Sequence, residues 1–327
     1  MNSRSTFFLS FIILFALLSC SSSSQNNPLP VISPVDTTPK PVLSGKLVYH
    51  SYSCYNCNDS KLYLYNFATN ERTVLSQNWT ITNPMNAHFS SDGTKIVFMG
   101  ISQVTNSWDI YIYTLGAKSQ PQNLTANSIV NDEDPKFSPD GHKIIFKQNG
   151  VLKEMDTSGN IIRSFIVPGG EASMPYYTTD GNNIIYAGKE SSGNTLNIYK
   201  YSITSGTTQP LQTISNLEEY YPIVIDDDTY LFTRWYSVKN QNDQVYMGYF
   251  NGTVALNLPF NESDANFSDA FPVDNRILLI SSTRIGGKGQ YDLFLTDKIS
   301  GKKWSLDLYN PYINSDKNDL GGCYSRF

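Results

Sequence analysis

The chain has 327 residues, with 24 Lys and Arg against 29 Asp and Glu, a formal net charge of −5 and a pI near 5.2. Charged residues make up 16% of it, below the ~25% of an average soluble domain. Because neutralising phosphates needs a clustered basic surface, this composition excludes a typical nucleic-acid-binding protein. Three histidines and four cysteines leave little material for a metal centre or a cysteine–histidine catalytic site, so no cofactor or metal is expected.

The N-terminus predicts an export signal. Arg4 supplies a positive charge, and an apolar stretch over residues 7–18 follows it. This stretch has the length of a signal-peptide core and is too short to span a bilayer, which takes roughly 20 residues. Residues 17–20, LLSC, resemble the bacterial lipobox. By that resemblance residues 1–19 form a lipoprotein signal peptide and Cys20 carries the lipid, the alternative being an ordinary secretory signal with an incidental cysteine.

Residues 20–45 are expected to form a disordered tether behind the lipidated cysteine. Five prolines and six serines with only two charged residues, Asp36 and Lys40, cannot bury enough apolar surface to fold. Ser21, directly after the lipidated cysteine, fits outer-membrane sorting in bacteria with two membranes. We therefore expect the protein to be anchored in the outer membrane through its lipid and to face the periplasm, with the cell surface as the alternative.

From residue 46 onward the chain repeats one unit. An apolar and aromatic strand with alternating pattern recurs every 41–48 residues, and its copies begin at Lys61, Asp109, Gly150, Asn197, Gln244 and Asp292. A turn followed by a β-branched run recurs five times, and its clearest copy is FSPDGHKIIF at residues 137–146. Asp-Gly in such a turn is hairpin chemistry, since glycine accepts a positive φ. Four-stranded units of this length are typical of propeller blades.

The sixth copy of the inner strand is expected at the C-terminus. Residues 318–325 match the approach to the turn at residues 132–138, with Tyr324 in the position of Phe137. The sequence therefore predicts an all-β fold over residues 46–327, a six-bladed β-propeller of four-stranded antiparallel blades. The C-terminal strand joins blade 1 and closes the ring, which removes the free sheet edges.

The repeat resembles a known family. Residues 135–146, PKFSPDGHKIIF, are a near copy of the TolB-like, PD40-type (WD40-like) propeller repeat P-x-F-S-P-D-G-x-x-I-x-F. The chain is similar to TolB-like propeller lipoproteins of Bacteroidetes-type bacteria, and the resemblance covers residues 46–327. It implies the fold but not one function, because the repeat serves scaffolds, enzyme domains and binding modules alike.

Among enzymes the TolB-like propeller resembles the oligogalacturonate lyases, which place His and Gln around a divalent metal in the central channel. Here His50 should lie on a second strand, His142 in a turn and His88 on an inner strand, so the three should not meet at one ion. A serine-hydrolase elbow, a phosphate-binding loop and a dinucleotide-binding glycine motif are absent from the sequence. The chain is therefore expected not to be an enzyme.

Cys54 and Cys57 fall in the expected loop between the second and third strands of blade 1. A single C-x-x-C is a weak zinc or redox signal, and a local disulfide is the plainer interpretation in an exported protein. Cys323 lies on the strand assigned to the same blade. It is either a buried thiol or a disulfide partner that locks the ring.

The mouth of the central channel is the candidate binding site, because propellers usually bind ligands at one end of their axis. Alignment on the Phe137 position places Asp132, Glu219 and Asp319 at one height, with Asn266 as the member from the sixth repeat. The residues that follow two and four positions later complete the candidate set with Asp134, Asn86, His88, Tyr176 and Tyr221. An uneven ring of acids, amides and tyrosines suits an asymmetric ligand, and ordinary hydrated channel lining is the alternative.

The sequence thus predicts a non-enzymatic, lipid-anchored propeller that serves as a protein-binding or scaffold module in the bacterial cell envelope. Its expected partner is an envelope protein or peptide, and contact with the membrane is expected through the lipid alone. The alternative is a carbohydrate-binding or glycan-processing, polysaccharide lyase-like envelope lipoprotein, because abundant Tyr and Trp permit sugar stacking.

Overall fold

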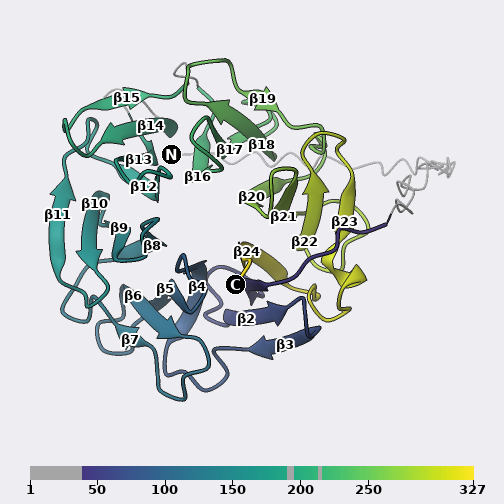
Figure 1. Ribbon diagram of the computed structural model, residues 1–327, viewed down its shortest axis with the longest axis horizontal. Coiled ribbons are helices and arrows are strands. Elements are labelled where there is room, and N and C mark those ends of the chain that lie inside the picture. Colours follow the sequence, from purple (N-terminus) through teal and green to yellow (C-terminus); the bar gives the residue numbers. More distant parts are fainter. Residues whose placement is uncertain (1–38, 190–194, 213–215) are drawn as a thin grey trace, which may run out of the picture. The chain divides into compact units, whose positions relative to one another are not determined.

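Six antiparallel sheets of four strands make up the computed structural model, which describes residues 39–189, 195–212 and 216–327. The expected signal peptide, the lipidation site Cys20 and the greater part of the tether lie outside the described residues. The sheets surround a common centre, with one edge strand of each sheet innermost (Figure 1). The predicted all-β propeller of six four-stranded blades is confirmed.

Five blades use strands that follow one another in sequence. Blade 2 contains β4 (Thr82–Phe89), β5 (Lys95–Ile101), β6 (Trp108–Thr114) and β7 (Gln122–Asn123). Blade 3 contains β8 (Asp132–Phe137), β9 (Lys143–Gln148), β10 (Val151–Asp156) and β11 (Ile161–Phe165). Blade 4 contains β12 (Ala172–Tyr177), β13 (Asn183–Gly188), β14 (Asn197–Ser202) and β15 (Thr208–Pro210). Blade 5 contains β16 (Glu219–Val224), β17 (Thr229–Trp235), β18 (Asp243–Tyr249) and β19 (Leu256–Asn257). Blade 6 contains β20 (Phe267–Pro272), β21 (Ile277–Ser282), β22 (Asp292–Asp297) and β23 (Lys303–Ser305).

Blade 1 joins the two ends of the propeller. Its innermost strand is β24 (Asn318–Ser325), and the other three are β1 (Lys46–Tyr52), β2 (Lys61–Asn66) and β3 (Glu71–Val74). Strands β24 and β1 pair antiparallel, with Tyr324 opposite Leu47 and Cys323 opposite Val48. Figure 1 shows the yellow C-terminal strand beside the purple start of the ring. The predicted closure by the C-terminal strand is therefore confirmed.

Each blade buries both of its faces against its neighbours. In β5 the side chains of Val97 and Met99 join a cluster with Phe137 of blade 3. The intervening Ile96 and Phe98 belong to a second cluster that includes Val48 of blade 1. Since successive strand residues point to opposite faces, a continuous apolar run such as KIVFM is what a doubly covered strand requires. Burying one such side chain contributes roughly 1.5–3 kcal/mol.

The turns between the first two strands of each blade are not all the same length. In blade 3 Phe137 lies opposite Ile144, seven residues on, and Ser138 Oγ donates to Asp140 inside the turn. In blade 6 Pro272 lies opposite Leu278, so this turn is one residue shorter. The sequence alignment, which assumed equal turns, is therefore wrong by one residue in blade 6. Its members there are Phe267, Asp269 and Phe271 rather than Asn266, Ser268 and Ala270.

Apart from the strands, a short 3-10 turn, η1 (Leu306–Leu308), follows β23. Ser305 caps this turn by accepting the backbone N–H of Asp307. Within the described ranges, no helix has the length and apolar character needed to cross a bilayer.

Candidate functional site

Every inner strand has a β-bulge at the same place, where one residue adopts a positive φ. The six bulge residues, which we call the axial ring, are Asn86 (54°), Asp134 (56°), Met174 (53°), Tyr221 (49°), Asp269 (51°) and Gly321 (61°). Each lies where the pairing with the next strand shifts register. Residues with a Cβ rarely adopt this conformation, since it costs roughly 1–2 kcal/mol. A bulge re-aims the side chain, and here all six residues line one cavity on the propeller axis.

Two cavities meet at the axial ring. The larger one, which we call the funnel, has a volume of about 450 Å³, which is within the range of small-ligand sites. Five members of the ring, all except Gly321, form part of its lining. The smaller one, the inner chamber, has a volume of about 60 Å³ and is lined by His88, Lys136 and Cys323 beyond the ring. The ring therefore forms the floor of the funnel.

Tyrosines line much of the funnel wall. They come from the β1–β2 loop region, blade 5 and the β21–β22 loop, and they are Tyr52, Tyr55, Tyr220, Tyr221 and Tyr291. Tyr220 and Tyr221 meet edge to face, with ring centroids 5.4 Å apart, and the Tyr220 hydroxyl donates to Asp243. Among the described residues, the hydroxyls of Tyr52, Tyr221 and Tyr291 have no hydrogen-bond partner. Burial raises the pKa of all three phenols, to about 12 for Tyr52, so they stay protonated and can donate.

Three carboxylates lie at the floor and on the wall of the funnel. Asp134 Oδ1 accepts a hydrogen bond from Asn86 Nδ2 at 3.1 Å, and Asp269 accepts from the backbone N–H of Gly321 at 3.4 Å. Burial raises the pKa of Asp243 to about 6, and burial likewise raises the pKa of Asp269 to about 6. A fourth acid, Glu133, is neutralised by Lys147 at 2.7 Å, whereas none of the three has an ion-pair partner among the described residues.

Two buried side chains at the inner chamber, His88 and Cys323, are in their neutral forms. His88 Nε2 lies 3.3 Å from the Tyr176 hydroxyl, and its Nδ1 accepts the backbone N–H of Phe137. Burial, together with the charge of Lys136, lowers the pKa of His88 to about 3. Burial raises the pKa of Cys323 to about 12, so it remains a thiol. Nowhere in the described part of the chain do three His, Cys, Asp or Glu side chains come together as a metal site.

The predicted ring of Asp132, Glu219 and Asp319 does not form. All three are fully buried and none lines the funnel, so their assignment to the channel mouth is wrong. Each has partners within the blades: Asp132 accepts from Gln148 and Glu219 pairs with Arg234, both directly opposite on the next strand, and Glu219 also accepts the backbone N–H of Ile198 in blade 4. Asp319 accepts from the backbone and hydroxyl of Ser315. These carboxylates precede the bulge, so they face the blade and not the axis.

The other five predicted residues lie on both sides of the axial ring. Asn86, Asp134 and Tyr221 meet at the floor of the funnel, whereas His88 and Tyr176 lie on the far side of the axial ring. The sequence analysis missed the remaining funnel residues, among them Asp243, Asp269 and the tyrosines Tyr52, Tyr55 and Tyr291. A signal existed for two of them, because Asp243 and Tyr291 directly precede the repeated Tyr-rich strands.

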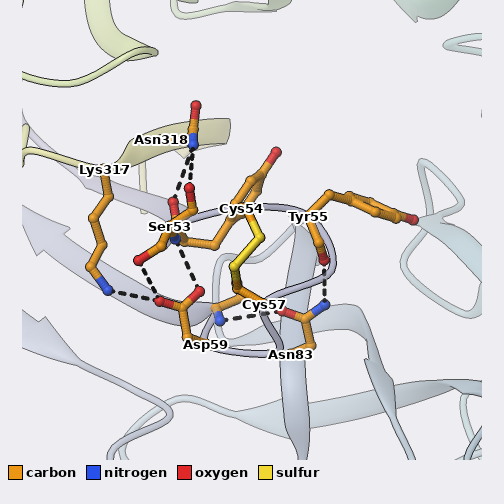
Figure 2. Close-up of a disulfide and its surroundings, with 10 residues drawn as sticks. Ser53, Cys54, Tyr55, Cys57, Asp59, Asn83, Lys317 and Asn318 are labelled. Atoms are coloured by element: carbon orange, nitrogen blue, oxygen red, sulfur yellow. Dashed lines mark hydrogen bonds and ion pairs between the residues drawn. A yellow bond between two sulfur atoms is a disulfide. The ribbon is translucent and has the colours of Figure 1, made fainter.

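A disulfide loop at the rim presents Tyr55 to the funnel. Cys54 and Cys57 are bonded to each other in the structure, and Cys323 is a buried free thiol on β24. Asp59 Oδ1 accepts the backbone N–H of Ser53, and its Oδ2 accepts the hydroxyl of the same residue. Asp59 is also paired with Lys317 at 3.0 Å (Figure 2). Asn83 Nδ2 donates to the carbonyl of Tyr55, whose ring extends away from the disulfide in Figure 2. The loop is thus fastened to blades 1 and 2.

Six closed four-stranded blades around an axial site define a six-bladed β-propeller with its candidate site on the axis. The chain belongs to the TolB β-propeller domain family, PD40, which matches residues 26–269. The predicted resemblance to TolB-like PD40 propellers is therefore confirmed. No curated protein matches the chain.

Solved structures share the fold at low identity. TolB from Acinetobacter baumannii is 17% identical with a TM-score of 0.64, over 88% of this chain and 68% of that one. Hydrazine synthase from Kuenenia stuttgartiensis is 13% identical with a TM-score of 0.69, over 87% of this chain and 47% of that one. The propeller domain of the Trilobed protease from Pyrococcus furiosus is 16% identical with a TM-score of 0.53, over 82% of each chain. The chain spans about half the length of the hydrazine synthase chain. These likenesses show the fold alone.

Proposed function

We propose that this protein is a non-enzymatic binding module of the bacterial cell envelope, which holds a segment of a partner protein in the funnel. The observation that carries the proposal is the funnel itself, a cavity of about 450 Å³ lined by tyrosines whose hydroxyls are in part unpaired. Tyrosine combines a large apolar ring with a polar tip, and for this reason it is enriched in protein interfaces. The funnel therefore offers contact area and hydrogen bonds to a chain that enters it.

The rigidity of the scaffold supports this role. The tyrosines stand on strand ends and loops of blades that are packed on both faces, and the Tyr55 loop is closed by its disulfide. Side chains held in this way lose little conformational freedom when a ligand binds. Buried His88 and Cys323, by contrast, have pKa values that favour their neutral forms, and neither lines the funnel. Binding is thus better supported than catalysis.

The placement in the cell rests on the sequence. We propose that Cys20 carries a lipid in the outer membrane and that residues 20–45 tether the propeller on the periplasmic side. The Pro-rich tether would reach roughly 75 Å at ~3 Å per residue, which lets the funnel meet partners away from the membrane. Membership of the TolB propeller family is compatible with an envelope location.

Binding of a glycan is the second candidate. At the rim Tyr55 lies beside Trp108, with ring centroids 6.3 Å apart, and aromatic faces of this kind can stack on sugar rings. A glycan ligand would engage the rim by stacking and would bind on a glycan array. A protein partner would be found by crosslinking instead.

Crosslinking from inside the funnel tests the proposal. Tyr291 in the full-length protein is replaced by the photo-crosslinking residue benzoyl-phenylalanine in the native envelope, and Tyr312, which is 73% exposed and does not line the funnel, serves as the control position. We expect a discrete adduct from position 291 alone. The crosslinked segment, made as a peptide, should bind the purified protein and lose affinity for the Tyr52→Ala variant. Equal adducts at both positions, or no adduct at position 291, would contradict a funnel-binding partner.

A further inference from the structure

The charges around the funnel are not balanced. Asp243 and Asp269 contribute two carboxylates, and their only polar partners are uncharged: Tyr220 for the first, and the Gly321 N–H with nearby serines for the second. Lys147 lines the funnel but is paired with Glu133. Lys136, whose charge opposes the effect of burial on the pKa of Asp269, lies in the inner chamber beyond the ring and donates to the carbonyl of Pro135 rather than to a carboxylate. The funnel therefore carries negative charge that a ligand can neutralise.

Asp134 independently offers an acceptor to a ligand with hydrogen-bond donors. Its side chain is more than nine-tenths buried, and it lines the floor of the funnel. One carboxylate oxygen accepts from Asn86, and the other has no hydrogen-bond partner among the described residues. This second oxygen remains accessible from the funnel, so a donor that enters the cavity can bond to it.

The tyrosines surround the same point. Tyr52, Tyr221 and Tyr291 come from different parts of the chain, and their hydroxyls are unpaired among the described residues. Burial raises the pKa of each, and Asp269 is close enough that its charge adds to this effect. Aromatic rings and carboxylates together favour an organic cation, because the ring face and the carboxylate both attract positive charge. A neutral sugar would gain only part of these interactions, and an acidic group would be repelled.

We propose that the funnel recognises an organic cation, a lysine ammonium or an arginine guanidinium on the bound segment, which lies between Asp134, Asp243 and Asp269 within the wall of tyrosines. This inference rests on the proposed function and names the chemistry of its ligand.

A buried histidine indicates that the cation is presented by a peptide. His50 is 4% exposed and lines the funnel, and its Nδ1 accepts the backbone N–H of Asn86. Burial lowers the pKa of His50 to about 3, so the ring is neutral and its Nε2 carries the hydrogen. This N–H has no acceptor among the described residues. A peptide carbonyl next to the cationic side chain would supply one.

Blocked pentapeptides test the preference directly. The probes are acetyl-Gly-Ser-X-Ser-Gly-amide with X as lysine, arginine, norleucine or glutamate, titrated calorimetrically into the full-length protein in detergent. Norleucine keeps the aliphatic stem of lysine and removes its charge. We expect the lysine and arginine probes to bind about tenfold tighter than the norleucine probe, with the glutamate probe weakest.

Two double variants locate the effect. Asp243→Asn with Asp269→Asn keeps the shape of both side chains and should reduce the preference to less than about threefold. Asp264→Asn with Asp316→Asn removes the same charge from exposed positions outside the funnel and should leave the preference unchanged. Should the first pair fail to fold, Asp134→Asn alone serves as the test, with a smaller loss expected in the same direction.

The outcomes separate this inference from the proposed function. Equal binding of the lysine and norleucine probes, or no binding of any probe at millimolar concentration, overturns the cation proposal even if crosslinking at position 291 succeeds. A preference for lysine that is lost in the Asp243 and Asp269 variant supports the cation proposal even if crosslinking fails. In that case the proposal of a protein partner is contradicted, and the proposed chemistry of the funnel is not. A preference that survives in that variant also overturns the cation proposal.

Discussion

The side-chain amide of Asn86 donates to Asp134 at 3.1 Å and so joins the bulges of blades 2 and 3 at the floor of the funnel. The backbone N–H of the same asparagine donates to His50 of blade 1 at 3.4 Å. Three neighbouring blades are therefore connected through one residue, which also has a positive φ of 54°. Asparagine tolerates this conformation better than most residues, and its amide makes the contact between neighbouring blades.

Two substitutions separate the conformational role of Asn86 from its hydrogen bond. Both Asn86→Gly and Asn86→Ala lose the bond to Asp134, worth about 1 kcal/mol. Both substitutes must adopt the positive φ, which strains alanine but not glycine, so we expect Asn86→Ala to be less stable than Asn86→Gly by roughly 1 kcal/mol. Urea unfolding of both variants, with equal slopes, measures the difference. An alanine variant as stable as the glycine variant would show that the strand relaxes around the substitution.

Glu219 should matter for stability and not for ligand binding. It is fully buried and pairs with Arg234 at 2.5 Å. Removing one member of a buried ion pair leaves an uncompensated charge, so we expect Glu219→Gln to lower the free energy of unfolding by about 3 kcal/mol. Glu219→Leu with Arg234→Met removes both charges and should be less destabilising than Glu219→Gln. A Glu219→Gln protein with wild-type stability and weakened peptide binding would instead show that Glu219 takes part in binding.

The architecture could be predicted from the sequence because each of its parts leaves a local signal. Alternating strands, an Asp-Gly turn and a fixed repeat length define the blade, and residues 318–325 repeat the inner-strand pattern at the end of the chain. The closure of the ring follows from that count. These signals are set by the backbone and survive exchange of individual side chains.

The site was harder to predict because a shift of one residue in a turn, or the partner of a single side chain, decides which residues face the axis. A turn shortened by one residue moves Asp269, and not Ser268, into the axial ring. Whether a carboxylate faces the axis or the blade depends on its partner across the sheet, as Glu219 and Arg234 show. Tyr55 lies in a loop outside the repeat, and Tyr291 precedes a third strand, so an alignment made on the inner strands includes neither of them. Spacing therefore found the floor of the funnel but not its walls.

The disulfide loop should influence binding more than stability. The loop lies at the surface, and its disulfide joins residues only three apart in sequence. Because it closes such a short segment, it contributes at most about 2 kcal/mol to the free energy of unfolding. We expect Cys54→Ser with Cys57→Ser to lower the melting temperature by no more than about 4 °C and to weaken binding of the lysine probe. Hydrogen exchange over residues 53–59 should become faster.

Cys323→Ala is the matched control for this loop, because it removes the buried thiol and leaves the loop intact. It should not alter exchange over residues 53–59. Unchanged exchange in the Cys54 and Cys57 variant would mean that the contacts from Asp59 and Asn83 hold Tyr55 in place without the disulfide.

Binding of the lysine probe should strengthen as the pH rises through about 6. The pKa values of Asp243 and Asp269 are raised by burial from 3.8 to about 6, so both are largely protonated at pH 5 and ionised at pH 7.5. The other titratable or charged groups that face them are Asp134, Lys136, Tyr52, Tyr220, Tyr221 and Tyr291. The tyrosines, whose pKa values are raised by burial, keep their protons at pH 5. We expect the affinity for the lysine probe to fall at least about fivefold between pH 7.5 and pH 5, with little change for the norleucine probe.

The stability of the free protein should change in the opposite direction over the same range. An acid whose pKa is higher in the folded state than in the unfolded state binds more protons when folded, so the free energy of unfolding falls as the pH rises from about 4 to about 6. Asp243→Asn with Asp269→Asn removes both ionisations and should flatten the pH dependence of probe affinity and of stability together. The measurement is calorimetric titration and thermal unfolding of both proteins at matched pH values. If affinity stayed pH-dependent in the variant while its stability became flat, the two carboxylates of blades 5 and 6 would only shape the funnel, and the proposed contact of the cation with them would be contradicted.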